Sequence, residues 1–264
     1  MNDLLVLCYH AVSPRWQMPY ALTPGALRAQ VERLLRAGYE PVTVSAALGA
    51  GPAADGRTLA VTFDDALVSV AEEALPVLDA LGVPATVFAC TDWVGRDAPM
   101  RIGYDRWLGT PHEAQLRSLG WDELAALRDR GWEIGSHTCT HPRLTRLDDE
   151  ALARELADSR RAIEERLGGE CRALAYPHGD CDARVAAAAA RAGYDFALTA
   201  RAGTGAADPL RVPRAVVLRD DGRARIALKT SVAARRLRGS DRAWRVLASG
   251  YRAVGGGRGH RGAA

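Results

Sequence analysis

Two short polar clusters in this 264-residue chain contain side chains that proteins use to bind metal ions. Asp64 and Asp65 follow the apolar run Leu59–Phe63, and two carboxylates this close repel each other unless a cation or a proton lies between them. His137 and His141 follow another apolar run, and two imidazoles in one turn can bind a single divalent transition-metal ion. The alternative for the two aspartates is an exposed turn or a helix cap, and the alternative for the two histidines is a pair of surface residues. Only six histidines occur in the chain, so two within five residues favour a metal site.

Two further polar clusters also end apolar runs. Tyr176, Pro177 and His178 belong to an Ala-Tyr-Pro-His-Gly-Asp sequence that is typical of a tight turn. Such a turn can direct backbone N–H groups at a developing oxyanion, and the alternative is an ordinary connection between a strand and a helix. His10 ends the first apolar run of the chain. A lone histidine of this kind is often structural.

These clusters need a framework that brings them together, and the chain alternates between strand-like and helix-like segments. Strand-like runs occur at Leu4–Tyr9, Leu59–Phe63, Ala85–Ala89, Glu133–Ser136, Ala173–Tyr176, Phe196–Thr199 and Val212–Leu218, with a weaker one at Pro41–Val44. Helical spacing is found from Pro24 to Gly38 and over 67–80, 121–130, 148–167 and 182–192. This alternation predicts a parallel sheet covered by helices. The number of units and the lack of a glycine-rich phosphate-binding turn favour a barrel over an open sheet. In a barrel, functional residues gather at the carboxyl ends of strands.

The composition is that of a globular protein. Apolar residues make up 48% and charged residues 25%, which excludes disordered, collagen-like and coiled-coil classes for most of the chain. The longest apolar runs have six residues, against roughly 20 for a membrane-spanning helix. The N-terminus lacks the pattern of a signal peptide, and the five cysteines suggest no disulfide framework, so we expect a cytoplasmic protein.

The net charge of +3 conceals an asymmetry between the two parts of the chain. Residues 222–264 carry +10 and residues 1–221 carry −7, which predicts a barrel domain over 1–221 and a basic helical tail over 222–264. Within the tail, apolar residues recur at helical spacing at Trp244, Leu247, Tyr251 and Val254, and the arginines lie off this stripe. A basic amphipathic helix can bind the inner face of an anionic membrane. The alternative is a helix packed on the barrel before a flexible end. Nucleic-acid binding is not expected, because no recognition motif accompanies the charge.

In combination, the four clusters resemble the motifs of the polysaccharide deacetylase family, carbohydrate esterase family four. The resemblance covers about residues 4–218 and rests on Thr62-Phe63-Asp64-Asp65, Ser136-His137-Thr138-Cys139-Thr140-His141 and Tyr176-Pro177-His178-Gly179. The opening Leu7-Cys8-Tyr9-His10-Ala11-Val12 resembles a branch in which a Tyr-His pair precedes the two aspartates. The resemblance implies a distorted (β/α)7 barrel. It also implies metal-dependent removal of an N-acetyl group from a sugar in a polysaccharide, oligosaccharide or lipid-linked glycan.

The resemblance also implies a role for each motif residue. Asp65, His137 and His141 correspond to the metal ligands, with zinc expected first among divalent metals, and Asp64 corresponds to the catalytic base. Two imidazoles and one carboxylate leave positions open for water and the substrate carbonyl. The turn at Tyr176, Pro177 and His178 is expected to contact the substrate and its oxyanion.

The chain departs from the family pattern at several positions. Ala66 follows the two aspartates where the family usually has glycine, and alanine would be strained there if φ is positive. Ala175 stands where the family often has arginine, so Arg214 is expected to hold Asp64 instead. The family's late histidine motif is missing, which makes His10 the expected general acid.

These departures leave other assignments open. His178, which replaces an aromatic residue of the family, is a second candidate for the general acid. Two other functions remain possible for the chain as a whole. One is a glycan-binding relative with impaired catalysis, and the other is a non-haem iron oxygenase with the same two-histidine, one-carboxylate site.

Overall fold

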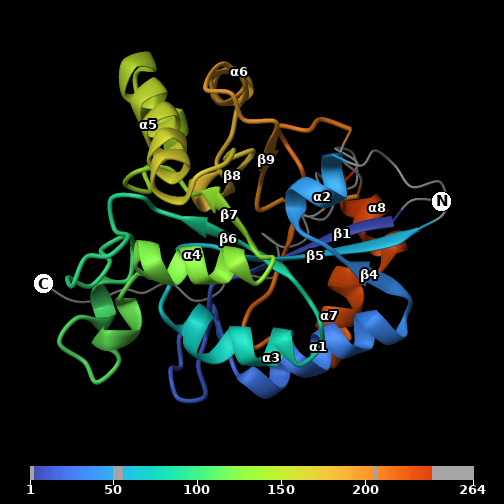
Figure 1. Ribbon diagram of the computed structural model, residues 1–264. Coiled ribbons are helices and arrows are strands. Elements are labelled where there is room, and N and C mark those ends of the chain that lie inside the picture. Colours follow the sequence, from blue (N-terminus) through green and yellow to red (C-terminus); the bar gives the residue numbers. More distant parts are fainter. Residues whose placement is uncertain (1–2, 50–55, 202, 205–206, 240–264) are drawn as a thin grey trace, which may run out of the picture.

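The fold is a curled parallel sheet surrounded by helices (Figure 1). The computed structural model describes residues 3–49, 56–201, 203–204 and 207–239. Seven strands follow one another in the order β10-β1-β5-β6-β7-β8-β9. In chain order they span Asp3–Tyr9 (β1), Arg57–Phe63 (β5), Ala85–Ala89 (β6), Glu133–Ser136 (β7), Ala173–Ala175 (β8), Phe196–Leu198 (β9) and Ala215–Val216 (β10). Tyr39–Pro41 (β4) adds to β5, while Ala11–Val12 (β2) and Ala21–Leu22 (β3) form a separate pair.

The sheet closes on itself between β9 and β10, as the predicted barrel requires. The N–H of Thr199 donates to the carbonyl of Val212 at 2.9 Å, and Leu198 and Val212 form a parallel bridge. Immediately afterwards, Ala215 pairs with Leu7 of β1. The last strand, predicted over Val212–Leu218, is therefore only two residues long, because the segment leaves β9 to pair with β1. The distorted seven-stranded barrel is confirmed.

Helices cover the outside of the barrel, with α1 and α3 on one side and α5 and α6 on the opposite side in Figure 1. The α-helices are Pro24–Arg36 (α1), Val44–Gly49 (α2), Leu75–Asp79 (α3), Trp121–Asp129 (α4), Asp149–Leu167 (α5), Ala183–Arg191 (α6), Arg223–Thr230 (α7) and Val232–Gly239 (α8). A π-helical turn, Val70–Ala74 (η1), precedes α3. Short 3-10 turns lie at Asp105–Trp107 (η2), Glu113–Leu116 (η3), Leu144–Arg146 (η4) and Pro177–Gly179 (η5). The helix predicted from 67 begins later, because Leu67 bridges to Ser118.

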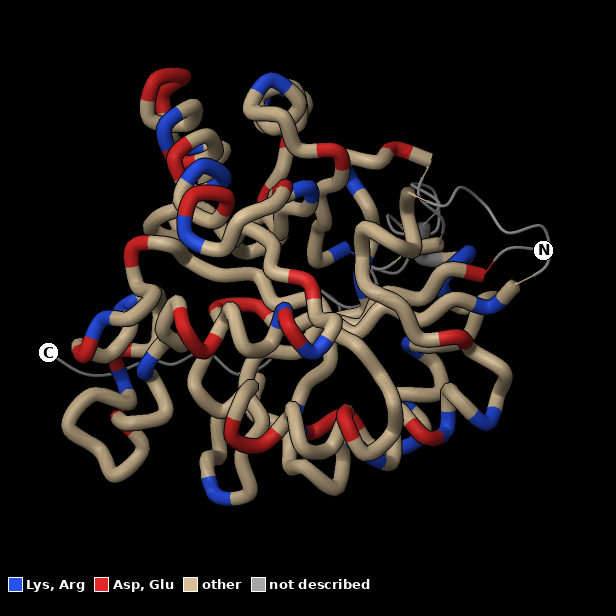
Figure 2. Tube along the Cα trace, viewed as in Figure 1, with Lys and Arg blue, Asp and Glu red and all other residues tan. Residues whose placement is uncertain are grey.

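Local chemistry explains the two clearest helices. Thr23 caps α1, since its hydroxyl accepts the N–H of Ala26 at 3.2 Å. Asp148 caps α5 in the same way through the N–H of Ala151 at 2.8 Å. Each helix turns a buried apolar stripe toward the sheet. Figure 2 shows charged residues on the surrounding helices and loops, with both signs along α5.

Part of the predicted basic tail is attached to the barrel. Arg235 in α8 is 3% exposed, donates to the carbonyl of Leu4 at 2.8 Å and pairs with Asp3. Arg33 in α1 donates to Thr230 in α7 at 2.9 Å. The apolar stripe predicted from residue 244 onward lies outside the described residues. Within the part of the chain that the structure describes, no helix has the length and hydrophobicity needed to cross a membrane.

Candidate metal centre and catalytic site

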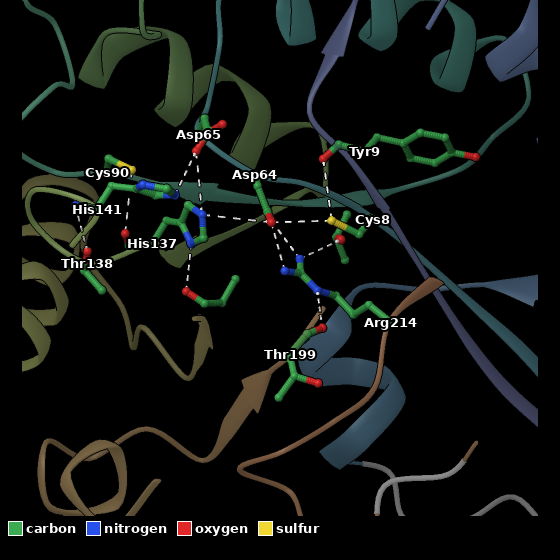
Figure 3. A network of polar contacts seen from close by, with 12 residues as sticks. Cys8, Tyr9, Asp64, Asp65, Cys90, His137, Thr138, His141, Thr199 and Arg214 are labelled. Atoms are coloured by element: carbon green, nitrogen blue, oxygen red, sulfur yellow. Dashed lines mark hydrogen bonds and ion pairs between the residues drawn. The ribbon is translucent and has the colours of Figure 1, made fainter. Parts of the chain in front are cut away.

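Three predicted metal ligands converge at the carboxyl ends of β5 and β7. The Oδ1 atom of Asp65 is 3.6 Å from Nε2 of His137 and 3.8 Å from Nε2 of His141. Figure 3 shows the three side chains directed toward one another. All three donor atoms lie within 4.8 Å of each other. The barrel therefore brings together residues that are more than 70 positions apart in sequence.

The hydrogen bonds around these residues leave suitable atoms for a cation. Nδ1 of His137 lies 2.7 Å from the carbonyl of Ala175, so this nitrogen donates and Nε2 faces Asp65 as an acceptor. Oδ2 of Asp65 accepts a hydrogen bond from the hydroxyl of Tyr104, whereas its buried Oδ1 has no partner among the described residues. A buried acceptor without a partner is costly. One carboxylate oxygen and two imidazole nitrogens are a donor set that fits zinc or a similar ion.

Burial also sets the protonation of the two imidazoles. It lowers the pKa of His137 to about 3 and that of His141 to about 4. Both rings are therefore neutral near neutral pH, as metal ligands must be. Burial raises the pKa of Asp65, which favours a nearby positive charge as a compensating partner.

Asp64 faces the opposite side of the strand end, toward Arg214 (Figure 3). The guanidinium donates to both carboxylate oxygens, at 2.6 and 2.8 Å, and the two side chains are only 1% and 5% exposed. Burial alone would raise the pKa of Asp64, but the ion pair with Arg214 holds it well below its usual range. Oδ2 of Asp64 also lies 3.9 Å from Nε2 of His137. An ionised carboxylate is thus fixed beside the three donor atoms.

Backbone strain is concentrated at this site. Five non-glycine residues in the described part of the chain have positive φ, and all of them belong to the predicted motifs or their immediate neighbours: Asp65 (70°), Ala66 (50°), Thr138 (68°), His141 (66°) and His178 (60°). Each L-residue in this region costs roughly 1–2 kcal/mol. Such conformations persist where surrounding contacts impose them, typically at functional sites. Ala66 thus has the positive φ at which an alanine is expected to be strained.

The turn after β8 differs from the prediction in one respect. The N–H of Tyr176 donates to the carbonyl of Leu198 at 3.0 Å, so it continues the pairing of β8 with β9 and does not face an oxyanion. Its hydroxyl donates to the carbonyl of Leu210 at 2.9 Å. Pro177 has no N–H to offer. Of the three residues in this predicted cluster, only His178 keeps a backbone donor for that role, and its ring lies 4.5 Å from the ring of His141.

His10 lies close to Asp64, in a second cluster of polar side chains. A ring nitrogen of His10, the Sγ atom of Cys8 and a carboxylate oxygen of Asp64 all lie within 4.8 Å of one another. The His10 ring packs against the Tyr20 ring with their centroids 4.7 Å apart, and its buried Nδ1 has no hydrogen-bond partner among the described residues. The bidentate pair with Arg214 makes a second cation here unfavourable, because Asp64 is already neutralised.

Two residues that contact the site were not identified as site residues from the sequence. Tyr104 comes from the long segment between β6 and α4, which shows no periodic pattern that would point toward Asp65. Cys8 donates from its Sγ to Oδ2 of Asp64 at 3.4 Å. Its place near the end of β1, two residues before His10, was the available signal.

Comparisons with known proteins give a consistent result. Residues 51–197 match the sequence profile of the family described as polysaccharide deacetylase. The "Putative polysaccharide deacetylase YxkH" of Bacillus subtilis (strain 168) is 24% identical over 208 residues, which cover 78% of this chain and 67% of that protein. The profile match begins after the Tyr9-His10 pair, so the assignment to a branch stays a prediction.

Solved structures share the fold. The Streptococcus pyogenes deacetylase PplD, in complex with acetate, superposes with a TM-score of 0.71 at 21% identity, covering 87% of this chain and 98% of that one. IcaB from Ammonifex degensii gives a TM-score of 0.70 at 26% identity, covering 87% and 97% of the two chains.

Proposed function

Because this chain belongs to the polysaccharide deacetylase family, we propose that it is a metal-dependent N-deacetylase that hydrolyses the N-acetyl group of a sugar in a polysaccharide, oligosaccharide or lipid-linked glycan. The observation that carries the proposal is the convergence of Asp65, His137 and His141, with an unpartnered carboxylate oxygen facing two neutral imidazoles. These three residues would hold the ion, with zinc as the expected metal. When bound, the ion would polarise the acetyl carbonyl and lower the pKa of a water molecule.

Asp64 is the proposed general base. Its carboxylate is ionised and oriented by Arg214, and it lies next to the donor triad. In the reaction it accepts the proton of the attacking water as the oxygen of that water bonds to the acetyl carbon. The C–N bond then breaks, acetate is released, and the sugar nitrogen must receive a proton to leave as an amine.

His10 is the proposed donor of that proton. It lies close to Asp64, and its Nδ1 atom has no hydrogen-bond partner among the described residues. The backbone N–H of His178 is the proposed donor to the carbonyl oxygen as negative charge develops there. The His178 imidazole is the second candidate for the general acid.

The observed contacts favour an active enzyme over a glycan-binding relative with impaired catalysis. Ala66 keeps the positive φ of its position, and the Asp64–Arg214 pair is complete despite Ala175 in the third motif. An iron oxygenase is disfavoured, because the ligand triad lies in a parallel barrel of the deacetylase type.

Acetate release by purified protein tests the proposal. The metal is removed with a chelator, zinc is restored, and acetate is measured against N-acetylated monosaccharides, chito-oligosaccharides, N-acetylated polymers and lipid-linked sugars, with O-acetylated sugars as the comparison. We expect acetate from at least one N-acetylated glycan, dependent on added metal. His137→Ala should abolish both metal binding and release, whereas His112→Ala, at a histidine that contacts Trp107, should change neither. Zinc-loaded protein that releases no acetate from any of these substrates would refute the proposal.

A further inference from the structure

We propose that Glu155, in α5, is a positioning residue for the metal centre, because its carboxylate holds the loop that carries both histidine ligands. The loop runs from His137 to His141, directly after β7. This role rests on the proposed function, since it presupposes that His137 and His141 bind the ion. Glu155 does not contact the donor atoms and would act through the backbone between them.

The hydrogen bonds of the Glu155 side chain are all with the middle of the loop. Its Oε2 atom accepts the backbone N–H of Cys139 at 2.8 Å and that of Thr140 at 3.0 Å. Its Oε1 atom accepts the hydroxyl of Thr140 at 2.6 Å. Hydrogen bonds to a charged acceptor are stronger than those between neutral groups. One carboxylate therefore fixes two consecutive peptide units.

The remaining polar groups of the loop show why this carboxylate matters. The N–H of Thr138 donates to Oγ of Ser136 at 3.0 Å, and the N–H of His141 donates to Oγ1 of Thr138 at 3.1 Å. Both of these partners are local. On the carbonyl side, Thr138 and Cys139 accept from the segment after β6. Backbone N–H and C=O groups require hydrogen-bond partners. Among the partners of this loop, Glu155 is the one that connects its N–H groups to a helix.

The loop also needs contacts from outside itself, because its backbone is strained at both ends. Thr138 has a φ of 68° and His141 a φ of 66°, and residues in this region stay there only when surrounding contacts impose the conformation. Without the carboxylate, the N–H groups of Cys139 and Thr140 lose their partner and the loop can relax. Relaxation would move the His141 ring relative to His137 and Asp65.

Glu155 differs from the other charged residues of its helix. Several of these form ion pairs along the exposed surface of α5, for example Arg154 with Glu150 and Arg161 with Asp158. No ion pair of Glu155 occurs among the described residues. Its charge is used by the loop instead, and the neighbouring Ser159 reinforces the same end of β7 by accepting from Ser136 at 2.8 Å.

Three substitutions of Glu155 test the proposal. Glu155→Ala removes every contact, and Glu155→Asp keeps the charge but shortens the side chain. Glu155→Gln keeps an amide oxygen that can accept both N–H groups, because both go to the same oxygen in the native protein. Glu150→Ala is the control for charge, since Glu150 is 85% exposed on the same helix. Ile163→Val is the control for reduced packing of α5, since Ile163 is buried.

Two readouts separate a positioning role from a purely structural one. The first is zinc affinity, measured by competition with a chromogenic chelator, which we expect Glu155→Ala to weaken by about 10–100-fold, as for other residues that orient metal ligands. The second is amide hydrogen exchange of the 137–141 segment in metal-free protein, which should accelerate at Cys139 and Thr140. Glu155→Asp should change both readouts in the same direction, and Glu155→Gln should stay close to the native protein. Both controls should leave the two measurements unchanged.

The outcomes distinguish this proposal from the proposed function. Folded Glu155→Ala or Glu155→Asp protein with native zinc affinity and native exchange would overturn the role of Glu155. Equal losses of zinc affinity in Glu155→Gln and Glu155→Ala would overturn it as well, because glutamine can still accept the two backbone hydrogen bonds and should keep the affinity close to native. Failure of the native protein to bind zinc would instead overturn the proposed function. The exchange measurement would then still decide whether Glu155 holds the loop.

Discussion

Replacing Arg214 by methionine removes the positive charge facing Asp64 while keeping a long side chain. Arg214 donates to Asp64 at 2.6 and 2.8 Å, and it also donates to Thr62 at 3.3 Å and Thr199 at 3.1 Å. In the variant, the Asp64 carboxylate would remain buried without the counter-charge of Arg214. Breaking a buried pair from one side costs about 3–5 kcal/mol. We expect Arg214→Met to lower the free energy of unfolding by an amount in this range.

Urea unfolding at pH 7, followed by tryptophan fluorescence, measures the effect. The matched control is Arg172→Met, because Arg172 pairs with Asp195 at the same 2.6 Å but with side chains that are 41% and 49% exposed. A surface pair of this kind contributes about 0–1 kcal/mol. Equal losses in the two variants would refute the reasoning, since burial would then not determine the strength of the Arg214 pair.

A double variant separates the pair from its surroundings. Arg214→Met combined with Asp64→Asn removes both charges. The double variant should therefore lose less unfolding free energy than the sum of the two single losses, by about 2 kcal/mol or more.

The pH dependence of stability supplies a second check in metal-free protein. In the native chain the pKa of Asp64 is lowered, so the pair stabilises the fold at neutral pH and this contribution is lost as pH falls through the folded-state pKa. In Arg214→Met, burial alone raises that pKa, so the gap in stability between the variant and the native protein should narrow between pH 7 and about 4.

Three other predictions address the remaining parts of the molecule. His10→Ala should lower kcat by roughly 10²–10⁴-fold with zinc content intact; near-normal turnover together with an inactive His178→Ala would transfer the acid role to His178. Tyr104→Phe removes the donor to Oδ2 of Asp65 and should weaken zinc affinity by about 10-fold in chelator competition, whereas unchanged affinity would show that Tyr104 does not orient the carboxylate. Truncation after residue 221 should lower the melting temperature, because it leaves Asp3 buried without Arg235. The 1–221 protein is also the control for flotation of the full chain with anionic vesicles, where equal flotation would dismiss membrane binding by the basic tail.

The barrel and its functional rim were predictable because both depend on repeating patterns. Apolar runs separated by amphipathic segments predict parallel strands, and the carboxyl ends of such strands meet at one rim. Asp65 and His137 could therefore be placed together from their positions at the ends of two runs, and the structure has them 3.6 Å apart. Arg214 was harder to predict, because the segment that carries it leaves β9 to pair with β1. Its pairing with Asp64 was nevertheless expected from the resemblance, because Ala175 stands where the family often has arginine.

The features that could not be predicted depend on single contacts without a period. Tyr104 reaches Asp65 from a segment with no regular strand or α-helix, so nothing in its spacing indicates the direction of its side chain. Glu155 lies on a helix that carries other acidic residues, such as the exposed Glu150, and only the path of the loop after β7 shows that Glu155 contacts this loop. The oxyanion role was predicted for the whole turn at Tyr176, Pro177 and His178, because the sequence does not reveal that β8 and β9 stay paired up to Tyr176.

Ala66 illustrates how a departure from a family pattern can be compatible with an intact site. Its φ of 50° costs roughly 1–2 kcal/mol relative to an ordinary conformation. Its methyl group is completely buried, and burial of a group of this size contributes about 0.8 kcal/mol. Glycine would remove the strain but would also lose about 0.5–1 kcal/mol through the greater freedom of the unfolded chain. These contributions nearly offset one another, so alanine is tolerated at a position where the backbone favours glycine. The neighbouring Asp65 keeps its orientation toward His137 and His141, and the substitution is therefore no argument against catalysis.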